Sequence, residues 1–583
     1  NDLAIRRGRL LSQLIDNLNK SALVGFDHTD LLRRLRVAWT GSQDHINRYW
    51  QAQDCAIRFR EYCLAHNLLD FSLTTEVFSR HLASHEVYQR YFAARYRHLL
   101  ADNLEENVPV AHQFLDWAGR QCCSTVLACD DGGGYRVFLG ADAEGAYELG
   151  ARCDRTLVLS DLIEPTADPL ALADRVRRVL RVESAIPTPA TQGRAERAIV
   201  DQGGGRFWIS MIHWVVERIA ERVGAGTPPE EIAIVAPYVS EVMRFAIEEE
   251  LHAKGLPLFL LRPATAFRDV PVIRGLLTLV RLAHPNWEIA IQGETQALPI
   301  EDVALALEVA LDGLDPIRAR HLARAALPLG QRSLADLSDA KGAAGQSNVR
   351  LWEYVGYQVR ERYETLRVWI ETYCQSAPEP VDVLLSKLFG DLLSHPGYGF
   401  HDALDKARDY GRLVESANKF RDAVGQDPAL DGCEVAREYV QLILGGTAAA
   451  EYLLDWPRNR RGGVILAPAY AYLTREMRST YQFWIDLGSD GWWNRPNQPL
   501  TNPYVLSSRW PVGQPWRDVE EDRARREALA RVLQGLAARC RGGIYLAYSE
   551  LGLDGVEQDG RLQRTIQLAL AGRMQPEGLA TDG

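Results

Sequence analysis

Residues 228–285 read PPEEIAIVAPYVSEVMRFAIEEELHAKGLPLFLLRPATAFRDVPVIRGLLTLVRLAHP. In this stretch short apolar runs alternate with amphipathic helical patterns, which is typical of α/β units. The paired prolines at its start mark a turn before the first apolar run. The expected elements are a strand, a helix and a second strand, at 232–236, 239–254 and 256–261. The stretch therefore predicts a parallel sheet that is covered by helices.

The rest of the chain extends this α/β pattern on both sides. Three further short strands are predicted before it and three after it, at 97–101, 124–128, 155–160, 463–467, 482–487 and 543–547. Helical periodicity fills two other regions, the start of the chain and the Leu- and Ala-rich part after 285. Residues 1–95 are predicted to form a helical accessory domain, and 96–164 the last part of a first α/β domain. Residues 165–285 and 461–583 are predicted to form the first and last parts of a second α/β domain. Residues 286–460 are predicted to form an inserted helical domain.

Length and composition set the class of protein. The chain has 583 residues, 46% of them hydrophobic, a size that fits three or four domains at about 150 residues each. Its net charge is −11, so any contact with nucleic acid must be local. No apolar run reaches the roughly 18 residues of a membrane span, and no secretory pattern opens the chain, so no membrane partner and a cytoplasmic location are expected. The nine cysteines lack zinc-binding spacing and are expected to be reduced thiols.

The stretch YRHLLADNLEENVP, residues 96–109, is the first candidate for chemistry. Its apolar run predicts a buried strand that ends at Asp102, and further acidic residues follow. A carboxylate at the end of a strand is the kind of group that holds the Mg²⁺ of a bound nucleotide. An exposed acidic loop after a strand is the alternative interpretation of the same residues.

This stretch, with NLLDF at 67–71 upstream, resembles the UvrD/Rep/RecB-like superfamily 1 DNA helicases, and 228–285 is similar to the same family in register over almost sixty residues. The resemblance implies a P-loop NTPase helicase fold of the α/β class, with two RecA-like parallel-sheet domains and helical insertion domains. Asp102 matches the family's metal-binding aspartate. Asn103 falls where the catalytic glutamate would be, and Glu105 falls at the family's glutamine. Because an amide cannot accept a proton, hydrolysis should be severely slowed.

Residues 127–142, LACDDGGGYRVFLGAD, resemble the family's third motif. Phe138 matches the aromatic residue on which a base of single-stranded DNA stacks, and Tyr135 is a second candidate for DNA binding. Asp142 matches the end of the motif. Gly133 stands where a glutamine senses the γ-phosphate, and Leu139 replaces an arginine. The DNA-facing residues are therefore better preserved than the nucleotide-facing ones.

The motifs further along the chain match the family less closely. Residues 520–548 resemble the sixth motif, in which Arg539 falls at the position of an arginine that reaches the γ-phosphate. A solvated helix face is the alternative for Arg539. No Gly-Lys dipeptide, and hence no phosphate loop, occurs in the sequence. Because the chain opens at Asn1 inside a helical pattern, we expect an upstream segment to be missing. Trp492 and Trp493 lie in a tryptophan-rich tract and are candidates for base stacking, with packing onto the core as the alternative.

The resemblance implies a protein that binds single-stranded DNA in repair or recombination, together with a repair or recombination partner protein. ATP and Mg²⁺ are the implied cofactors. One alternative is an active ATP-dependent helicase or translocase in which Glu105 or Glu106 replaces the absent glutamate. A second alternative is a non-catalytic scaffold of a helicase–nuclease complex. The family also expects a phosphate-contacting arginine near Asp161, and none is convincingly placed there.

Overall fold

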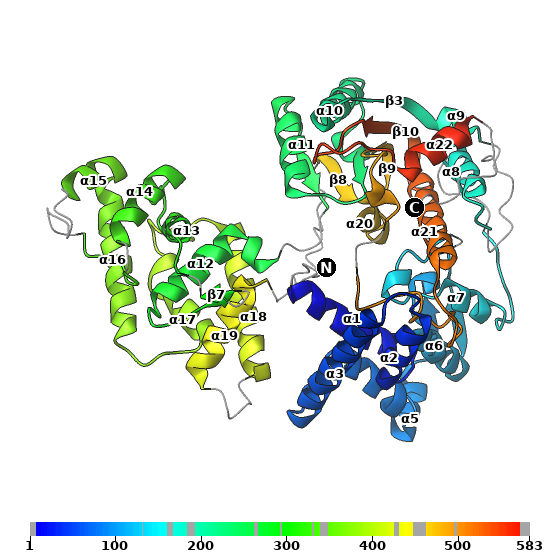
Figure 1. The fold of residues 1–583 in the computed structure, drawn as a ribbon, viewed down its shortest axis with the longest axis horizontal. Helices are drawn as coiled ribbons and strands as arrows, with labels where there is room; N and C mark the ends of the chain where they lie inside the picture. The colour runs from blue at the N-terminus through cyan, green and yellow to red at the C-terminus, as the bar shows by residue number, and fades with distance from the viewer. Residues whose placement is uncertain are drawn as a thin grey trace. The chain divides into compact units, whose positions relative to one another are not determined.

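The computed structural model describes residues 7–130, 132–159, 167–183, 193–261, 266–291, 294–295, 297–328, 331–337, 348–424, 431–446, 462–494 and 498–571. The chain divides into two compact units. The helical unit comprises Asn1–Ser12, Tyr62–Leu68 and Ala264–Leu453, and the sheet unit comprises Gln13–Glu61, Leu69–Pro263 and Leu454–Gly583. The expected mixed α/β class with parallel sheets is confirmed (Figure 1). The region around Asp161 lies outside the described residues.

A six-stranded parallel sheet forms the larger part of the sheet unit. Its strands lie in the order β3 (Ile199–Gly205), β10 (Cys540–Ser549), β9 (Ser479–Trp484), β4 (Ile232–Ala236), β8 (Val464–Pro468) and β5 (Leu258–Leu260). The strand predicted at 232–236 coincides with β4, whose five residues are all buried. Burial on both faces explains why the sequence of β4 is a continuous apolar run.

Helices cover both faces of this sheet (Figure 1). Ile232, Ile234 and Ala236 of β4 pack on one side against α10 (Trp208–Gly224) and α11 (Glu241–Ala253). Ala233 and Val235 point to the opposite side, as the two-residue period of a strand requires. The helices on that side are α8 (Ala167–Val179), α9 (Ala195–Ala198), α20 (Ala469–Thr474), α21 (Asp518–Ala538) and α22 (Arg561–Leu570).

A second parallel sheet holds only two strands, β1 (His98–Ala101) and β2 (Ser124–Leu127), joined through α6 (Pro109–Gln121). Both strands were expected, but the prediction that they are buried is wrong, because Leu100 of β1 and Val126 of β2 are 77% and 58% exposed. The third strand predicted at 155–160 is also wrong for its described part. Residues 155–159 have no strand geometry, and Leu157 and Leu159 are 77% and 91% exposed. An apolar run becomes a strand only where a neighbour pairs with it, and among the described residues β1 and β2 pair only with each other.

The opening part of the chain is helical, as predicted. Its elements are α1 (Arg7–Val24), α2 (Leu31–Ala38), α3 (Gln43–Ala65), α4 (Phe71–Glu76), a π-helix (Val77–Leu82) and α5 (Glu86–Arg95), and the boundaries between the two units fall inside α1 and α3. Gln13 Oε1 accepts the backbone N–H of Leu500 at 2.8 Å, and Asn17 Nδ2 donates to its carbonyl at 2.8 Å. These reciprocal bonds attach α1 to residues 498–516, whose Val505 and Leu506 share a core with α2 and α3.

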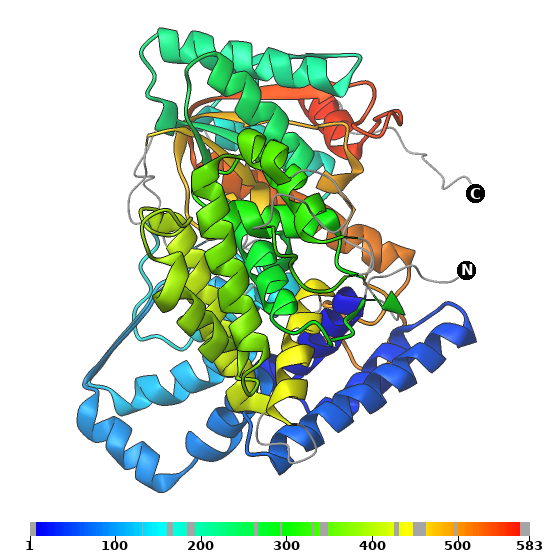
Figure 2. The same cartoon turned by 90° about the vertical axis from the view of Figure 1, so that its left-hand side faces the viewer.

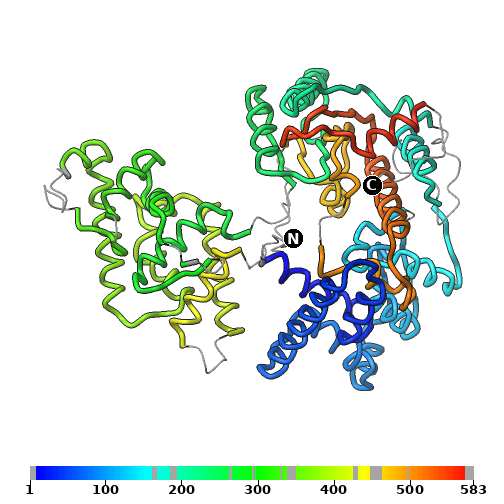
Figure 3. Tube along the Cα trace, viewed as in Figure 1, coloured from blue at the N-terminus to red at the C-terminus, as the bar shows by residue number. Residues whose placement is uncertain are grey.

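The helical unit has its own core, built from α12 to α19. Helix α12 contacts α13, α17 and α18. The helices of this unit are the green to yellow ones in Figure 2. These helices, green to yellow in Figure 3, all lie in sequence between β5 and β8. The two strands are neighbours in the sheet. The bounds are α12 (Pro271–Leu282), α13 (Ile300–Ala310), α14 (Pro316–Ala326), α15 (Asn348–Val355), α16 (Tyr357–Cys374), α17 (Val381–Leu388), α18 (Leu404–Val424) and α19 (Gly432–Leu444).

A buried carboxyl, that of Asp486, lies just after β9 and is 6% exposed. Its Oδ1 accepts the indole N–H of Trp208 at 3.1 Å. Burial raises the pKa of Asp486 from 3.8 to about 6, against the lowering effect of this hydrogen bond. The folded state therefore binds a proton more tightly than the unfolded state, and this carboxyl makes stability fall as the pH rises from about 4 to about 6.

We expect Asp486→Asn to raise the free energy of unfolding at pH 7 by about 3 kcal/mol, the energy equivalent of the difference between 3.8 and about 6. The amide oxygen can still accept the Trp208 N–H, and asparagine tolerates the positive φ of 53° at this position. Urea unfolding at pH 4 and pH 7 measures the effect. The exposed Asp490 of the same loop supplies the control variant, Asp490→Asn. Equal pH dependence in the wild type and Asp486→Asn would contradict the prediction.

Candidate functional site

Asp102 stands at the carboxyl end of β1, as the sequence predicted, and its side chain is exposed. Its Oδ1 accepts the backbone N–H of Asn103 at 2.9 Å. Asn103 adopts the left-handed conformation, with φ of 52° and ψ of 46°, which asparagine tolerates better than most residues. Its side-chain amide donates to Glu476 Oε1 at 3.3 Å. The loop after β1 therefore meets the loop between β8 and β9.

Glu105 is buried, with 3% exposure, and its role is structural in this conformation. Its Oε2 accepts the backbone N–H of Asp130, in the loop after β2, at 3.0 Å. Burial raises the pKa of Glu105, and the backbone hydrogen bonds only partly oppose this. Gly133 lies against the same side chain, because a Cβ at Gly133 would fall 2.5 Å from Glu105 Cγ. A glutamine at position 133 would therefore not fit beside Glu105.

Glu106 makes the densest set of contacts at the site. Its Oε1 accepts the backbone N–H groups of Gly134 at 2.9 Å and Tyr135 at 2.7 Å, and its Oε2 accepts that of Arg136 at 3.0 Å. Three consecutive N–H groups can converge on one carboxylate because Gly134 has a φ of 83°, which favours glycine. This carboxylate fixes the conformation of the loop after β2.

Tyr135 is only partly exposed, which counts against the prediction that it binds DNA. Its ring packs against the core beneath the six-stranded sheet, and its hydroxyl lies close to Gly535 of α21. Arg539 Nη1 donates to the Tyr135 hydroxyl at 3.4 Å and to the Gly535 carbonyl at 3.2 Å, and its guanidinium lies 5.7 Å from the centre of the Tyr135 ring. Burial raises the pKa of Tyr135 despite the nearby cation. Two residues predicted to bind different ligands thus contact each other.

Phe138 lies in a short 3₁₀ helix, Val137–Leu139, and its side chain is 45% exposed. Its ring meets that of Tyr470, which is 38% exposed, edge to face with centroids 5.8 Å apart. Tyr470 lies in α20, directly after β8. The buried ammonium of Lys20, on α1, donates to the carbonyl of Phe138 and fixes the backbone beneath the ring. The structure therefore presents a half-exposed aromatic pair where the two sheets approach each other.

Asp142 anchors the end of the same motif. Its Oδ1 accepts the N–H of Gly145 at 3.0 Å and so caps α7 (Ala143–Gly150), and Arg509 Nε donates to the same oxygen at 2.9 Å. Ser508 donates to Oδ2 at 2.9 Å. Burial would raise the pKa of Asp142, but these hydrogen bonds outweigh it and hold the pKa below its usual value. Asp142 therefore joins α7 to the 498–516 tract.

The prediction that Trp492 and Trp493 stack bases is also corrected. The two residues are 8% and 6% exposed and belong to the core on the α21 side of the sheet. The Trp492 indole donates to the carbonyl of Ile485 at 3.1 Å, and the guanidinium of Arg561 lies 4.5 Å from the Trp493 ring centre. Large aromatic side chains can stabilise a core as well as a binding surface, and Trp492 and Trp493 pack in the core.

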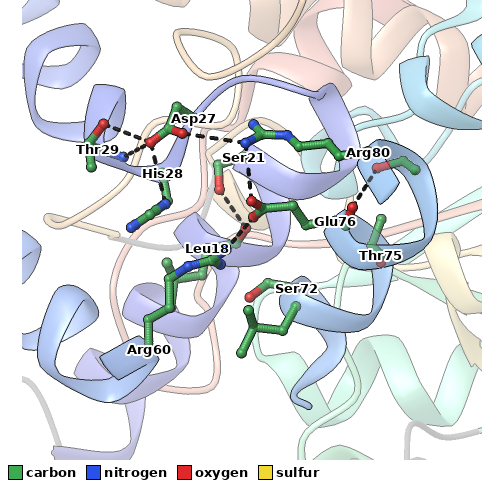
Figure 4. Close-up of polar contacts among 12 residues, drawn as sticks. Leu18, Ser21, Asp27, His28, Thr29, Arg60, Ser72, Thr75, Glu76 and Arg80 are labelled. Atoms are coloured by element: carbon green, nitrogen blue, oxygen red, sulfur yellow. Dashed lines mark hydrogen bonds and ion pairs between the residues drawn. The ribbon is translucent and has the colours of Figure 1, made fainter. Parts of the chain in front are cut away.

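A charge network joins the opening helices of the sheet unit (Figure 4). Glu76 contacts Arg60 of α3 at 2.5 Å and Arg80 at 3.1 Å, and Arg80 reaches Asp27 at 3.4 Å. Hydrogen bonds from Thr29 lower the pKa of Asp27 to about 2. Glu76 is the last residue of α4, where the helix widens into the π-helix. The network fixes α3 and α4 to the turn after α1, so we interpret it as structural.

Sequence reasoning missed Tyr470, and it considered Glu106 only as a replacement for the absent catalytic glutamate. Glu106 follows two other candidate residues, and nothing in the sequence distinguishes a loop-holding carboxylate from a catalytic one. Tyr470 could have been found, because it comes directly after a predicted strand, and residues at the carboxyl ends of parallel strands line ligand sites. Its contact with Phe138 spans more than three hundred residues and is not visible in the sequence.

The residues at the site fit part of what a Mg²⁺-nucleotide requires. Asp102 is exposed and could hold the metal. A hydrolytic centre fits less well, because Asn103 has an amide and Glu105 and Glu106 are committed to backbone N–H groups. In the part of the chain that the structure describes, no cluster of three or more His, Cys, Asp or Glu side chains could hold a metal ion. Within the same ranges, no helix is both long and apolar enough to cross a membrane.

The fold and the site define an α/β protein with parallel sheets and a polar loop cluster at the end of β1 and β2. The chain matches no protein-family model, and no curated protein matches its sequence.

We expect Glu106→Gln to lower the free energy of unfolding by about 2 kcal/mol, because hydrogen bonds to a charged acceptor contribute about 1.5–3 kcal/mol and the amide nitrogen cannot accept an N–H. Trypsin should also cleave faster after the exposed Arg136. Urea unfolding and timed proteolysis measure the two effects. Glu144→Gln, at an exposed carboxylate of α7, is the matched control and should change stability by less than about 0.5 kcal/mol. Equal cleavage of the two variants would argue against the role assigned to Glu106.

Proposed function

We propose that this chain is a UvrD/RecB-like helicase-fold protein that binds single-stranded DNA in repair or recombination, with impaired ATP hydrolysis. A parallel sheet interrupted in sequence by a helical unit, and a second parallel sheet whose first strand ends at Asp102, support two RecA-like domains with a helical insertion. The observation that carries the proposal is the half-exposed pair of Phe138 and Tyr470.

The exposure of this pair favours binding to bases. Phe138 and Tyr470 meet edge to face, and 45% of the Phe138 side chain remains exposed to a ligand. Base–aromatic stacking contributes about 1–3 kcal/mol per base and tolerates any sequence. The exposed Arg136 lies two residues away on the same loop and offers a positive charge for a phosphate. Local charge of this kind is compatible with a chain whose net charge is −11.

The hydrogen bonds of Glu105, Glu106 and Arg539 support impaired hydrolysis. A general base needs a carboxylate that can approach water, and this step typically contributes a factor of about 10²–10⁴ to the rate. Glu105 and Glu106 accept backbone N–H groups instead, and Arg539 is held by Tyr135. Asp102 would hold the Mg²⁺ of a bound nucleotide, where the metal neutralises phosphate charge. These contacts disfavour the alternative in which Glu105 or Glu106 acts as the catalytic base.

We expect Phe138→Ala to weaken binding of an oligothymidylate by roughly 10- to 100-fold, the equivalent of one lost stacking interaction. Tyr470→Ala should weaken it by a smaller factor, because Tyr470 supports the Phe138 ring. Fluorescence anisotropy with a labelled oligonucleotide measures both. Leu139→Ala is the matched control, because Leu139 is 49% exposed on the same 3₁₀ helix but is not aromatic.

A salt titration of the same binding reaction tests for phosphate contacts, which give a negative slope of the logarithm of affinity against the logarithm of salt concentration. Equal affinities of the Phe138→Ala and Leu139→Ala variants would sink the stacking role. No measurable binding of the wild type at low salt would instead favour the scaffold alternative.

We expect single-turnover ATP hydrolysis by the wild type to stay at the background rate, with and without single-stranded DNA, because no free carboxylate stands at the position of Asn103. Rapid quenching with radiolabelled ATP and excess protein measures the rate. Asp102→Asn is the control, because any hydrolysis that belongs to this site must disappear in it. Fast hydrolysis by the wild type that Asp102→Asn abolishes would overturn the impaired centre and favour an active helicase.

A further inference from the structure

A cavity of about 350 Å³ lies in the helical unit among α17, α18 and α19. This volume is in the range of small-ligand sites. The apolar part of its wall includes Ala417 and Phe420 from α18 and Val435 and Ala436 from α19. The cavity shares no residue with the site at Asp102, so a ligand bound in it is independent of the proposed function.

The polar part of the wall contains a buried carboxylate with one unused oxygen. Asp382 of α17 is 8% exposed, and its Oδ2 accepts Arg421 Nη2 at 2.9 Å. No described residue donates a hydrogen bond to its Oδ1. Leaving a buried charged acceptor unsatisfied is costly, typically more than the roughly 1–3 kcal/mol of a neutral group. A group that donates to Oδ1 inside the cavity would remove that cost.

The charges around the cavity favour a cation. Asp382 and Asp422 line it with two carboxylates, whereas Arg421 is the one cationic side chain among the described lining residues. One carboxylate is therefore left in excess after the Asp382–Arg421 ion pair. Arg421 Nε is also buried without an acceptor among the described residues, so it can donate to a carbonyl of the same ligand.

We propose that this cavity binds an alkyl guanidinium or alkyl ammonium group. The cation donates to Asp382 Oδ1, its aliphatic stem lies against Ala417 and Ala436, and the ring of Phe420 covers it. Two sources carry this chemistry, an arginine or lysine side chain of a partner protein and a free polyamine-like molecule. A carbonyl next to the stem, as in a peptide, would also use Arg421 Nε.

Calorimetric titration of the full chain tests the proposal with three probes. Agmatine represents the free cation, N-acetyl-arginine N-methylamide represents the side chain in a peptide, and N-acetyl-citrulline N-methylamide is the neutral analogue of nearly the same shape. We expect saturable one-site binding of at least one cationic probe and at least tenfold weaker binding of the citrulline compound. Preference for agmatine identifies a free amine as the ligand, and preference for the arginine compound identifies a protein partner.

Two variants locate the site. Asp382→Asn should weaken binding at least tenfold, but it can also loosen the helices by leaving Arg421 unpaired. Ala436→Leu therefore fills the cavity without touching the ion pair, and it should abolish binding while the chain stays folded by circular dichroism. Asp405→Asn, at an exposed carboxylate of α18, should bind like the wild type. Absence of saturable binding, equal binding of the citrulline compound, or unchanged binding by Ala436→Leu would each overturn the proposal.

Discussion

The carboxylate of Glu106 holds together the region on which the proposed function depends. It collects the N–H groups of three successive residues, Gly134 to Arg136, and so fixes a loop that would otherwise have no regular hydrogen bonds. From this loop Tyr135 enters the core beside α21, and Phe138 follows three residues later with its ring half exposed. Glu106 therefore holds the loop that carries both the partly buried Tyr135 and the half-exposed Phe138.

Because Glu105 and Glu106 accept backbone N–H groups, few carboxylates at the end of β1 are available for catalysis. A carboxylate that accepts three backbone N–H groups is held in place and has most of its acceptor sites occupied, so it is poorly suited to orient a water molecule. Glu105 is likewise committed and buried, and Asn103 offers an amide in a left-handed turn that suits asparagine. Of the acidic residues in this loop, Asp102 alone remains exposed with only a local hydrogen bond. The geometry therefore favours binding over hydrolysis.

The sequence predicted the strands that contain an apolar run, but it was wrong that β1 and β2 are buried. Strand β4 is a continuous apolar run, which explains its correct prediction, whereas β3 was missed because Gly203 and its neighbours carry no apolar signal. Leu157 belongs to an apolar run without a partner strand, and Trp492 is an aromatic residue that packs inward. At the site, Asp102 could be placed because it ends a strand. The contacts of Glu106 and Tyr470 join segments distant in sequence, and no local pattern encodes them.

The helical unit obeys a constraint that the sheet imposes on it. Because β5 and β8 are parallel neighbours, the chain that leaves the carboxyl end of β5 must cross back to the amino edge of the sheet before it enters β8. The connecting segment is long enough to fold around its own core, and α12 to α19 do so. Asp382 of α17 and Arg421 of α18 pair with each other inside this unit, so their ion pair belongs to the packing of the helical unit and not to the sheet.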